Sequence, residues 1–313
     1  MGISRRLRKG PFVLSLRHVL PPEIEETVKL LSPAERGLAR SIRRESAKTP
    51  PSVAGRFDLL RQFCAFSGDR IVGTAYYAHS PDGSATLGKV RFARRYRCLE
   101  NEASLISFAA EELLRKGCLL IMGLAESTKE ATRLQKANFL RFGTLLLMEL
   151  KSKNCKRLEL RNHGLSWERY SFRNHPEFAR LLQEICAEGH DFPRLPRRAD
   201  PEMTLSAHMS VGVFDPRLWF LAKEGPKAVG LLLLSRRTDG KLWLTYLGVI
   251  PEKRRLGIGR VLLERATHIA SAEECSALVL GVDSENEAAI RLYKRAGFKR
   301  VAKWDGYFRI SMK

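Results

Sequence analysis

The sequence of 313 residues predicts a mixed α/β fold built from two similar halves. The first observation is a strand-like run, Leu242–Val249, followed by a glycine-containing turn and then by apolar residues at helical spacing over 258–270. The second is an internal repeat, in which turns, strands and helices recur in the same order. Each half is therefore expected to hold a central mixed β-sheet flanked by helices.

Residues that match at a nearly constant offset indicate the repeat. A shift of about 157 residues aligns the early turns and strands, and a shift of about 158 aligns the later ones. The matched positions are Phe63 with Phe220, Ala65 with Ala222, Gly68 with Gly225, Val72–Gly73 with Val229–Gly230, Asp82–Gly83 with Asp239–Gly240, Gly123 with Gly281, Ala131 with Ala289, and Arg133–Leu134 with Arg291–Leu292. We place the boundary near Lys151, so the expected domains are residues 1–150 and 151–313.

In the first half, strand-like and helix-like runs alternate between turn residues. Ser32 and Pro33 are typical of a helix start. The expected elements are a strand over 12–16, a helix over 21–31, a second helix from Ser32 to a break at 48–52, a hairpin of 63–66 and 70–78, a helix over 103–116, a strand over 118–123, a helix over 129–138 and a strand over 143–150.

The second half repeats this plan and adds a segment with three prolines, 189–201. The strand 242–249 ends at Ile250–Pro251, and the helix after it begins near Ile258. A further apolar strand over 276–282 leads into a helix that starts at Asn286.

The turn between the strand 242–249 and its helix is typical of an anion-binding site. A strand that turns through Gly257 and Gly259 into a helix leaves amide hydrogens pointing outward, where the helix dipole favours a phosphate. Side chains at the two glycines would keep a ligand away from the backbone. Arg254, Arg255 and Arg260 add positive charge. The turn therefore predicts a pyrophosphate site.

Two common nucleotide motifs are missing from this turn. A dinucleotide-binding turn needs a third glycine, but Leu262 follows at that spacing. A mononucleotide loop with Gly-Lys-Ser/Thr at its end is also not found.

The turn and the helix that starts at Asn286 together resemble the GNAT superfamily of acetyl-coenzyme A dependent N-acetyltransferases. The pyrophosphate signature of that family, Gln/Arg-x-x-Gly-x-Gly/Ala, is matched by Arg254, Gly257 and Gly259. Its downstream signature is matched by Asn286, Ala289, Leu292, Tyr293, Gly297 and Phe298. The resemblance is specific over residues 215–310 and fainter over 55–150, and the tandem layout resembles that of mycothiol synthases.

The resemblance implies acetyl-coenzyme A as the cofactor. It implies that the backbone N–H of Val249 stabilises an oxyanion, and that Tyr293 is the general acid for the departing thiolate. By helical spacing alone Tyr293 also fits a core aromatic, and Asn286 fits either a helix cap or a contact to pantetheine. The implied cofactor-binding residues are Val249, Arg254, Arg255, Leu256, Gly257, Ile258, Gly259, Arg260, Asn286 and Tyr293.

The expected function is transfer of an acetyl group to an amine of a small molecule or a peptide. The general base stays open, because the strand 241–249 has no carboxylate where family members often carry one. The candidates are Tyr246 acting through water, His190, Asp191 and His208. The missing carboxylate leaves a non-catalytic acetyl-coenzyme A sensor or scaffold as the alternative. In this family the segment 189–201 is expected to line the acceptor site, or else to be an exposed connector.

The first half lacks the residues of the anion-binding turn. Depending on the shift, Leu99 or Glu100 replaces Gly257, and Asn101 or Glu102 replaces Gly259, so that a carboxylate there would repel pyrophosphate. Thr128 and Gln135 stand where the second half has Asn286 and Tyr293. We expect a degenerate GNAT-like domain.

Composition excludes some classes of protein and leaves the partners open. The net charge of +21 is spread through both halves, and we interpret it as a basic surface that attracts an anionic cofactor, because no nucleic-acid-binding motif accompanies it. The six cysteines have no metal-ligand spacing, so we expect thiols, mostly buried, and no metal. No apolar run is long enough to span a bilayer, and we expect a soluble, cytoplasmic protein. The oligomeric state is not indicated.

Overall fold

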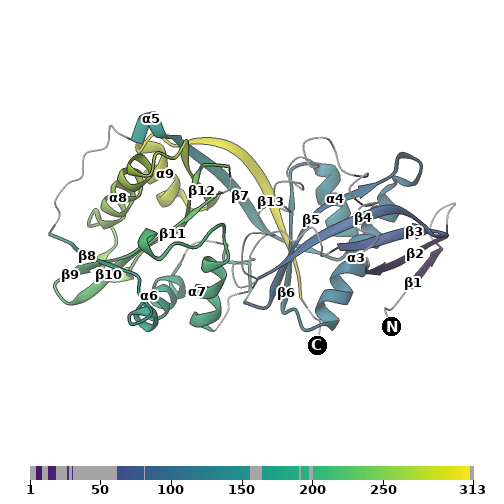
Figure 1. The fold of residues 1–313 in the computed structure, drawn as a ribbon, viewed down its shortest axis with the longest axis horizontal. Coiled ribbons are helices and arrows are strands. Elements are labelled where there is room, and N and C mark those ends of the chain that lie inside the picture. The colour runs from purple at the N-terminus through teal and green to yellow at the C-terminus, as the bar shows by residue number, and fades with distance from the viewer. Residues whose placement is uncertain are drawn as a thin grey trace. The chain divides into compact units, whose positions relative to one another are not determined.

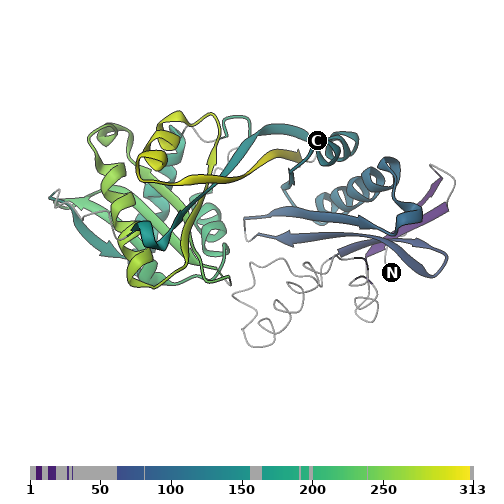
Figure 2. The ribbon, with the colours of Figure 1, turned by 90° about the horizontal axis from the view of Figure 1, so that it is seen from above.

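The computed structural model describes residues 5–8, 13–18, 27, 30, 62–80, 82–155, 164–189, 192–196, 200–237 and 239–310. Its strands and helices confirm the mixed α/β fold that the sequence predicts (Figures 1 and 2). The helices expected over 21–31 and from Ser32 onward lie outside the described residues.

The chain packs as two compact units, one of Met1–Phe142 with Asp305–Lys313 and one of Gly143–Trp304. The chain passes between them inside two long strands, β7 (Leu140–Lys151) and β13 (Lys299–Ile310). Residues 145–151 of β7 pair with β12 (Ala277–Asp283), and residues 305–310 of β13 pair with β6 (Leu120–Ala125). Each unit therefore completes its sheet with a strand from the other half of the sequence. The repeat boundary near Lys151 stays a prediction.

The sheet of the first unit runs from β1 (Arg5–Arg8) through β2 (Val13–His18), β3 (Gln62–Ser67), β4 (Arg70–His79) and β5 (Ser84–Phe92) to β6 and the end of β13. The predicted hairpin is confirmed as β3 and β4. A short helix, η3 (Arg94–Tyr96), precedes α3 (Leu99–Arg115), which begins one turn earlier than expected. The α4 helix (Thr128–Lys136) follows β6. The core includes Phe63, Phe108 and Leu113.

The sheet of the second unit has the order β7, β12, β11 (Leu242–Val249), β10 (Lys227–Arg236), β9 (Trp219–Glu224) and β8 (Ser166–Arg169). The turn-and-helix region that the sequence singled out is confirmed as β11, η5 (Pro251–Lys253) and α8 (Ile258–Ala272). The remaining helices are α5 (Ser152–Cys155), α6 (His175–Ala187), α7 (Pro201–Met209), η4 (Pro216–Leu218) and α9 (Glu287–Arg295).

Two glycines let helices approach opposite faces of the β10–β11 pair. A Cβ atom on Gly230 would lie 3.1 Å from Leu262 of α8, and one on Gly248 would lie 2.6 Å from Ile185 of α6. Because side chains alternate along a strand, Val249 faces α8 while its neighbour Gly248 faces α6. The end of β11 is thus held between the two helices (Figure 1).

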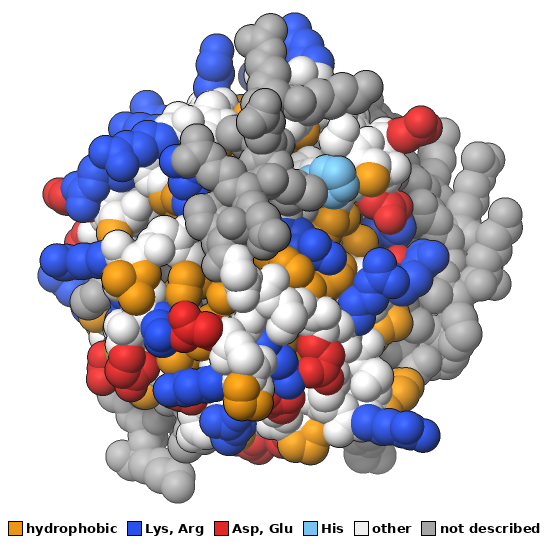
Figure 3. Space-filling view, turned by 90° about the vertical axis from the view of Figure 1, so that its left-hand side faces the viewer, with side chains coloured by type: hydrophobic (Ala, Val, Ile, Leu, Met, Phe, Trp, Pro, Cys, Tyr) orange, Lys and Arg blue, Asp and Glu red, His pale blue; other side chains and the backbone are white. Residues whose placement is uncertain are grey.

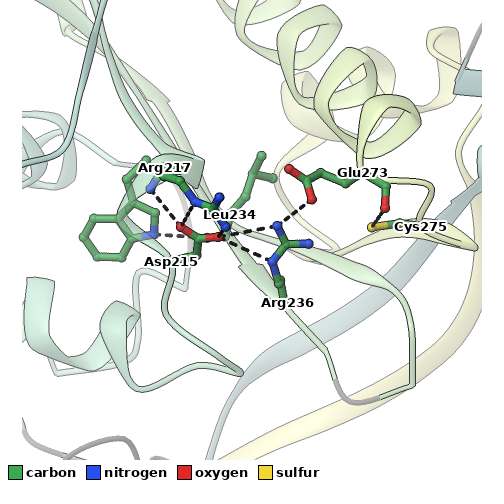
Figure 4. A network of polar contacts seen from close by, with 7 residues as sticks. Asp215, Arg217, Leu234, Arg236, Glu273 and Cys275 are labelled. Atoms are coloured by element: carbon green, nitrogen blue, oxygen red, sulfur yellow. Dashed lines mark hydrogen bonds and ion pairs between the residues drawn. The ribbon is translucent and has the colours of Figure 1, made fainter.

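A network of ion pairs and hydrogen bonds lies at the C-terminal end of β10 in the second unit (Figure 4). Asp215 accepts hydrogen bonds from Nε and Nη2 of Arg217, at 3.0 and 2.8 Å, and lies 3.4 Å from Nη2 of Arg236. Arg236 also pairs with Glu273 at the end of α8. The hydrogen bonds from Arg217 lower the pKa of Asp215 below its ordinary value. This network ties the segment before β9 to β10 and α8.

Figure 3 shows one face of the molecule, on which Lys and Arg side chains are scattered with Asp and Glu among them. All six cysteines are thiols, and four of them are buried. Within the described ranges no helix is long and apolar enough to cross a membrane, and no His, Cys, Asp and Glu side chains are grouped as metal ligands.

Candidate functional site: a parted sheet beside a helix N-terminus

Strands β11 and β12 part in the middle of the second sheet. Their parallel ladder joins Leu242–Leu244 to Leu278–Leu280 and, in the described structure, ends there. Beyond that point β12 stays paired with β7 as far as Asp283, while β11 continues to Val249 along β10. The last residues of β11 therefore present a strand edge toward the gap that β12 leaves.

The register of β11 turns the amide of Val249 toward this gap. The pairing register between β11 and β10 shifts between Leu233 and Leu234. Thr245 lies opposite this shift as the extra residue of a β-bulge. The N–H of Ile250 donates to the carbonyl of Val229 at 3.1 Å. Because backbone groups alternate along a strand, the N–H of Val249 points away from β10. The predicted oxyanion donor thus faces the parted edge.

The N-terminus of α8 is open on the side of its glycines. Gly257 has φ +85° and caps the helix, and Arg255 before it also has a positive φ, +63°. The amides of Arg260 and Val261 donate to the carbonyl of Gly257. The backbone N–H groups from Leu256 to Gly259 therefore lie at the start of α8, where no preceding helix carbonyl can accept their hydrogen bonds. A Cβ atom on Gly257 would meet nothing within 4 Å, so its side faces open space.

Gly259 brings the turn close to β11 and α9. A Cβ atom there would lie 3.7 Å from Leu292 and 4.0 Å from Val249. The glycine turn, Val249 at the end of β11 and Leu292 of α9 are therefore neighbours.

The three predicted arginines have different surroundings. Arg254 donates from Nε to the carbonyl of Val249 and from its Nη atoms to those of Ile185 and Glu188, at 3.0–3.2 Å. Its guanidinium therefore caps the C-terminus of α6, a role that no sequence motif indicates. Arg255 is exposed. Its contact and that of Arg254 with a pyrophosphate stay predictions.

The other predicted residues are divided between the core and the surface. Leu256 is exposed, whereas the side chain of Ile258 is buried and leaves only its amide for a ligand. Asn286 accepts a hydrogen bond from the amide of Ala289 at 3.0 Å and so caps α9, which is one of the two roles expected for it. Tyr293 is buried, and its ring lies 5.7 Å from that of Phe298.

Three groups gather where α6 and α7 meet β11. The Sγ atom of Cys186 lies 3.2 Å from Oη of Tyr246, and the ring of His208 lies 5.3 Å from the tyrosine ring. Burial lowers the pKa of His208 to about 4. His208 is therefore neutral at physiological pH but is a weak base. The candidates His190 and Asp191 lie outside the described residues.

Asp283 is a residue that the sequence reasoning missed. It lies at the end of β12, is 1% exposed, and accepts hydrogen bonds from the amides of Phe192 and Glu285 at 2.8 and 3.0 Å. It therefore holds the backbone of Phe192 at the end of β12, beside the parted strands. An aspartate directly after an apolar strand was the available signal.

Ion pairs join α3 and α4, the two helices of the first unit that correspond to α8 and α9. Glu102, in the first turn of α3, pairs with Arg133 of α4 at 2.6 Å, and both side chains are largely buried. Glu100 pairs with Lys136 at 3.0 Å, and this hydrogen bond lowers the pKa of Glu100. Carboxylates therefore lie at the helix start where the second unit has glycines.

The comparison with protein families agrees with this geometry. Residues 178–298 match the model described as the acetyltransferase (GNAT) family. Residues 178–298 of the chain belong to the GNAT acetyltransferase family. Members of this family use acetyl-coenzyme A, and the parted strand edge beside an open helix N-terminus fits a ligand with an extended arm and a pyrophosphate.

Several named acetyltransferases resemble part of the chain. The mycothiol acetyltransferase of Streptomyces griseus is 30% identical over 135 residues, which are 43% of this chain and 38% of that protein. The peptidyl-lysine N-acetyltransferase YjaB of Escherichia coli is 31% identical over 110 residues, 35% of this chain and 65% of that protein. The match thus spans less than two-fifths of the mycothiol acetyltransferase.

Solved structures resemble the chain along nearly its whole length. A GCN5-related N-acetyltransferase from Sphaerobacter thermophilus has a TM-score of 0.66 at 16% identity and covers 95% of both chains. A tandem GNAT protein from the clavulanic acid biosynthesis pathway has a TM-score of 0.59 at 13% identity and covers 96% of this chain and 99% of its own. At such identities the likeness establishes a tandem GNAT fold alone.

Proposed function

We propose that the protein is an N-acetyltransferase that moves the acetyl group of acetyl-coenzyme A to an amine of a small molecule or a peptide. The observation that carries the proposal is the parted β11–β12 edge beside the open N-terminus of α8. The cofactor supplies the acetyl group as a reactive thioester. The relatives named for mycothiol and for peptidyl-lysine support both kinds of amine acceptor.

The second unit supplies groups to hold this cofactor. The amides from Leu256 to Gly259 bind the pyrophosphate, assisted by the positive end of the helix dipole and by the charge of Arg255. Gly257 lets the phosphate approach the backbone. The edge of β11 binds the extended arm through main-chain groups, as an added strand would bind.

Two groups are assigned to the chemistry. The N–H of Val249 donates to the oxygen that gains negative charge as the amine attacks. Tyr293 carries a proton on Oη that it would give to the departing sulfur of the bound cofactor. The amine must arrive neutral, because β11 carries no carboxylate and His208 is a weak base.

That missing carboxylate also favours the second candidate, a non-catalytic acetyl-coenzyme A sensor or scaffold. The two candidates differ in turnover and agree in binding. Release of coenzyme A thiol in a screen of small amines and lysine peptides separates them.

Substitution at Gly257 tests the binding step. Gly257→Gln and Gly257→Glu have the same length and the same strain at a positive φ, and they differ in charge. At about 5 Å and an effective dielectric constant of about 20, two unit charges repel by about 3 kcal/mol. Calorimetric titration with acetyl-coenzyme A should therefore find the Glu variant about a hundredfold weaker than the Gln variant. Equal affinities of the two variants would contradict the anchoring of pyrophosphate at this turn.

A further inference from the structure

Residues 299–304 of β13 form a strand edge in the second unit. In the sheet, β13 lies between β6 and β7, but its pairing with β6 covers only residues 305–310. In the described part of the chain, residues 299–304 therefore have a strand neighbour on the β7 side and none on the opposite side. We call this segment the basic edge. Its exposed residues are Lys299, Arg300, Val301 and Lys303.

The cations of the basic edge are not neutralised. Among the described residues, Lys299, Arg300 and Lys303 form no ion pair. The next carboxylate along the strand, Asp305, pairs with Arg141 at 2.9 Å. Residues 288–304 contain six Lys and Arg and no Asp or Glu. The edge therefore keeps a positive charge that attracts an anionic partner.

The repeated strand of the first half differs at these positions. A shift of about 158 residues places part of β7 on the basic edge. The residues of β7 that correspond to its three cations are Arg141, Phe142 and Leu145. Two of the three are apolar, and the arginine is paired with Asp305. The repeat thus forms this strand without free cations, so their presence on β13 needs another explanation.

The order of side chains along the basic edge indicates what kind of strand fits beside it. Because side chains alternate, Lys299, Val301 and Lys303 share one face of the strand. Val301 is 52% exposed, so an apolar partner residue would cover it between two acidic ones. The complementary pattern of an added strand is Glu-x-Val-x-Glu.

Two other occupants fit the basic edge less well. A second copy of the same edge would place cations opposite cations, which is unfavourable between paired strands. A nucleic acid would neutralise the cations but would leave the main-chain groups of the edge and the apolar Val301 unmatched.

We propose that the basic edge binds an acidic, extended peptide segment of a partner protein as an added β-strand. Main-chain hydrogen bonds supply affinity, and the three cations select acidic residues. None of these residues belongs to the predicted cofactor site. Binding of the partner is therefore independent of acetyl-coenzyme A and goes beyond the proposed transfer reaction.

Fluorescence anisotropy with the labelled peptide Thr-Glu-Thr-Val-Glu-Glu-Thr tests this surface in the full-length protein at one salt concentration. The peptide should bind the wild type. Lys299→Gln with Arg300→Gln and Lys303→Gln should weaken it by about tenfold, because each exposed charge pair changes affinity by about two- to threefold. A matched variant, Lys129→Gln with Arg173→Gln and Lys227→Gln, removes the same charge from exposed positions elsewhere and should keep the wild-type affinity. Both variants should keep Tm within about 2 °C.

Backbone methylation separates an added strand from charge attraction alone. Alternate N–H groups of a strand point to the same edge, so two peptides N-methylated at alternate residues in opposite phase differ in which edge they block. One phase should lose binding and the other should keep it. Equal binding of both phases would overturn strand addition.

The remaining outcomes would also overturn the proposal. These are failure of the peptide to bind the wild type, and equal weakening in the matched variant, which would indicate unspecific charge. Tighter binding of a single-stranded oligothymidylate that depends on the same three cations would assign the basic edge to nucleic acid. A wild-type dimer in sedimentation velocity that dissociates in the variant of the basic edge would assign this edge to a second copy of the chain.

Discussion

Replacing Arg254 with alanine removes the three hydrogen bonds that join the end of β11 to the C-terminus of α6. Each hydrogen bond from a charged donor contributes about 1 kcal/mol or more to stability, and the carbonyls of Ile185 and Glu188 regain some water in the variant. We therefore expect a loss of about 2–3 kcal/mol. For a unit of this size, that loss corresponds to a fall in Tm of about 4–12 °C.

Scanning calorimetry of Arg254→Ala and Arg255→Ala measures the difference between adjacent arginines. Arg255→Ala should leave Tm within about 2 °C, because surface substitutions usually change stability by less than about 0.5 kcal/mol. It should weaken acetyl-coenzyme A severalfold, whereas Arg254→Ala should change the affinity less. An unchanged Tm together with a large loss of affinity in Arg254→Ala would refute this reasoning and would place its guanidinium on the pyrophosphate.

Three further predictions concern the second unit. Tyr293→Phe should keep the affinity for acetyl-coenzyme A and lower kcat by about a hundredfold or more, since the variant retains the ring but has no proton to donate; a normal kcat in the thiol-release assay would remove Tyr293 from the chemistry. Gly248→Ala should destabilise the unit by about 1–3 kcal/mol in urea unfolding, because its Cβ atom would lie 2.6 Å from Ile185 and 2.8 Å from Tyr246; an unchanged midpoint would count against the close packing of α6 on β11. The pKa of His208 is lowered to about 4 in the folded protein, so the unfolded chain binds this proton more readily. The contribution of His208 to stability is therefore fully present above about pH 6.5 and declines toward pH 4. His208→Gln should lower the slope of unfolding free energy against pH in that window, by at most the slope that uptake of one proton on unfolding produces. An identical slope in both proteins would contradict the burial of the imidazole.

Local sequence signals were enough to predict the strand, turn and helix around Gly257. The apolar run of β11 and the helical spacing of α8 depend on neighbouring residues, and the glycine turn requires a positive φ that the structure has. The degenerate first half was also suggested by single positions, since Glu102 stands where the second unit has Arg260 or Gly259. Its pairing with Arg133 was not predicted, because the partner lies on another helix.

Features that depend on distant partners could not be predicted. Nothing in the residues of β7 and β13 indicates that each strand completes a sheet formed mainly by the other half of the sequence. The motif located Arg254 but not the direction of its side chain, which is set by a carbonyl 66 residues earlier. Asp283 likewise binds an amide 91 residues away. The strand β5 was missed because Gly88 and Lys89 interrupt its alternation of buried and exposed residues.

The most direct test of the account is the stoichiometry of acetyl-coenzyme A binding to the full-length protein, measured by calorimetric titration. The open glycine turn of the second unit and the Glu102–Arg133 pair of the first predict one site per chain. Two sites per chain would contradict the closure of the first unit. No binding would contradict the acetyltransferase function and leave the GNAT fold alone.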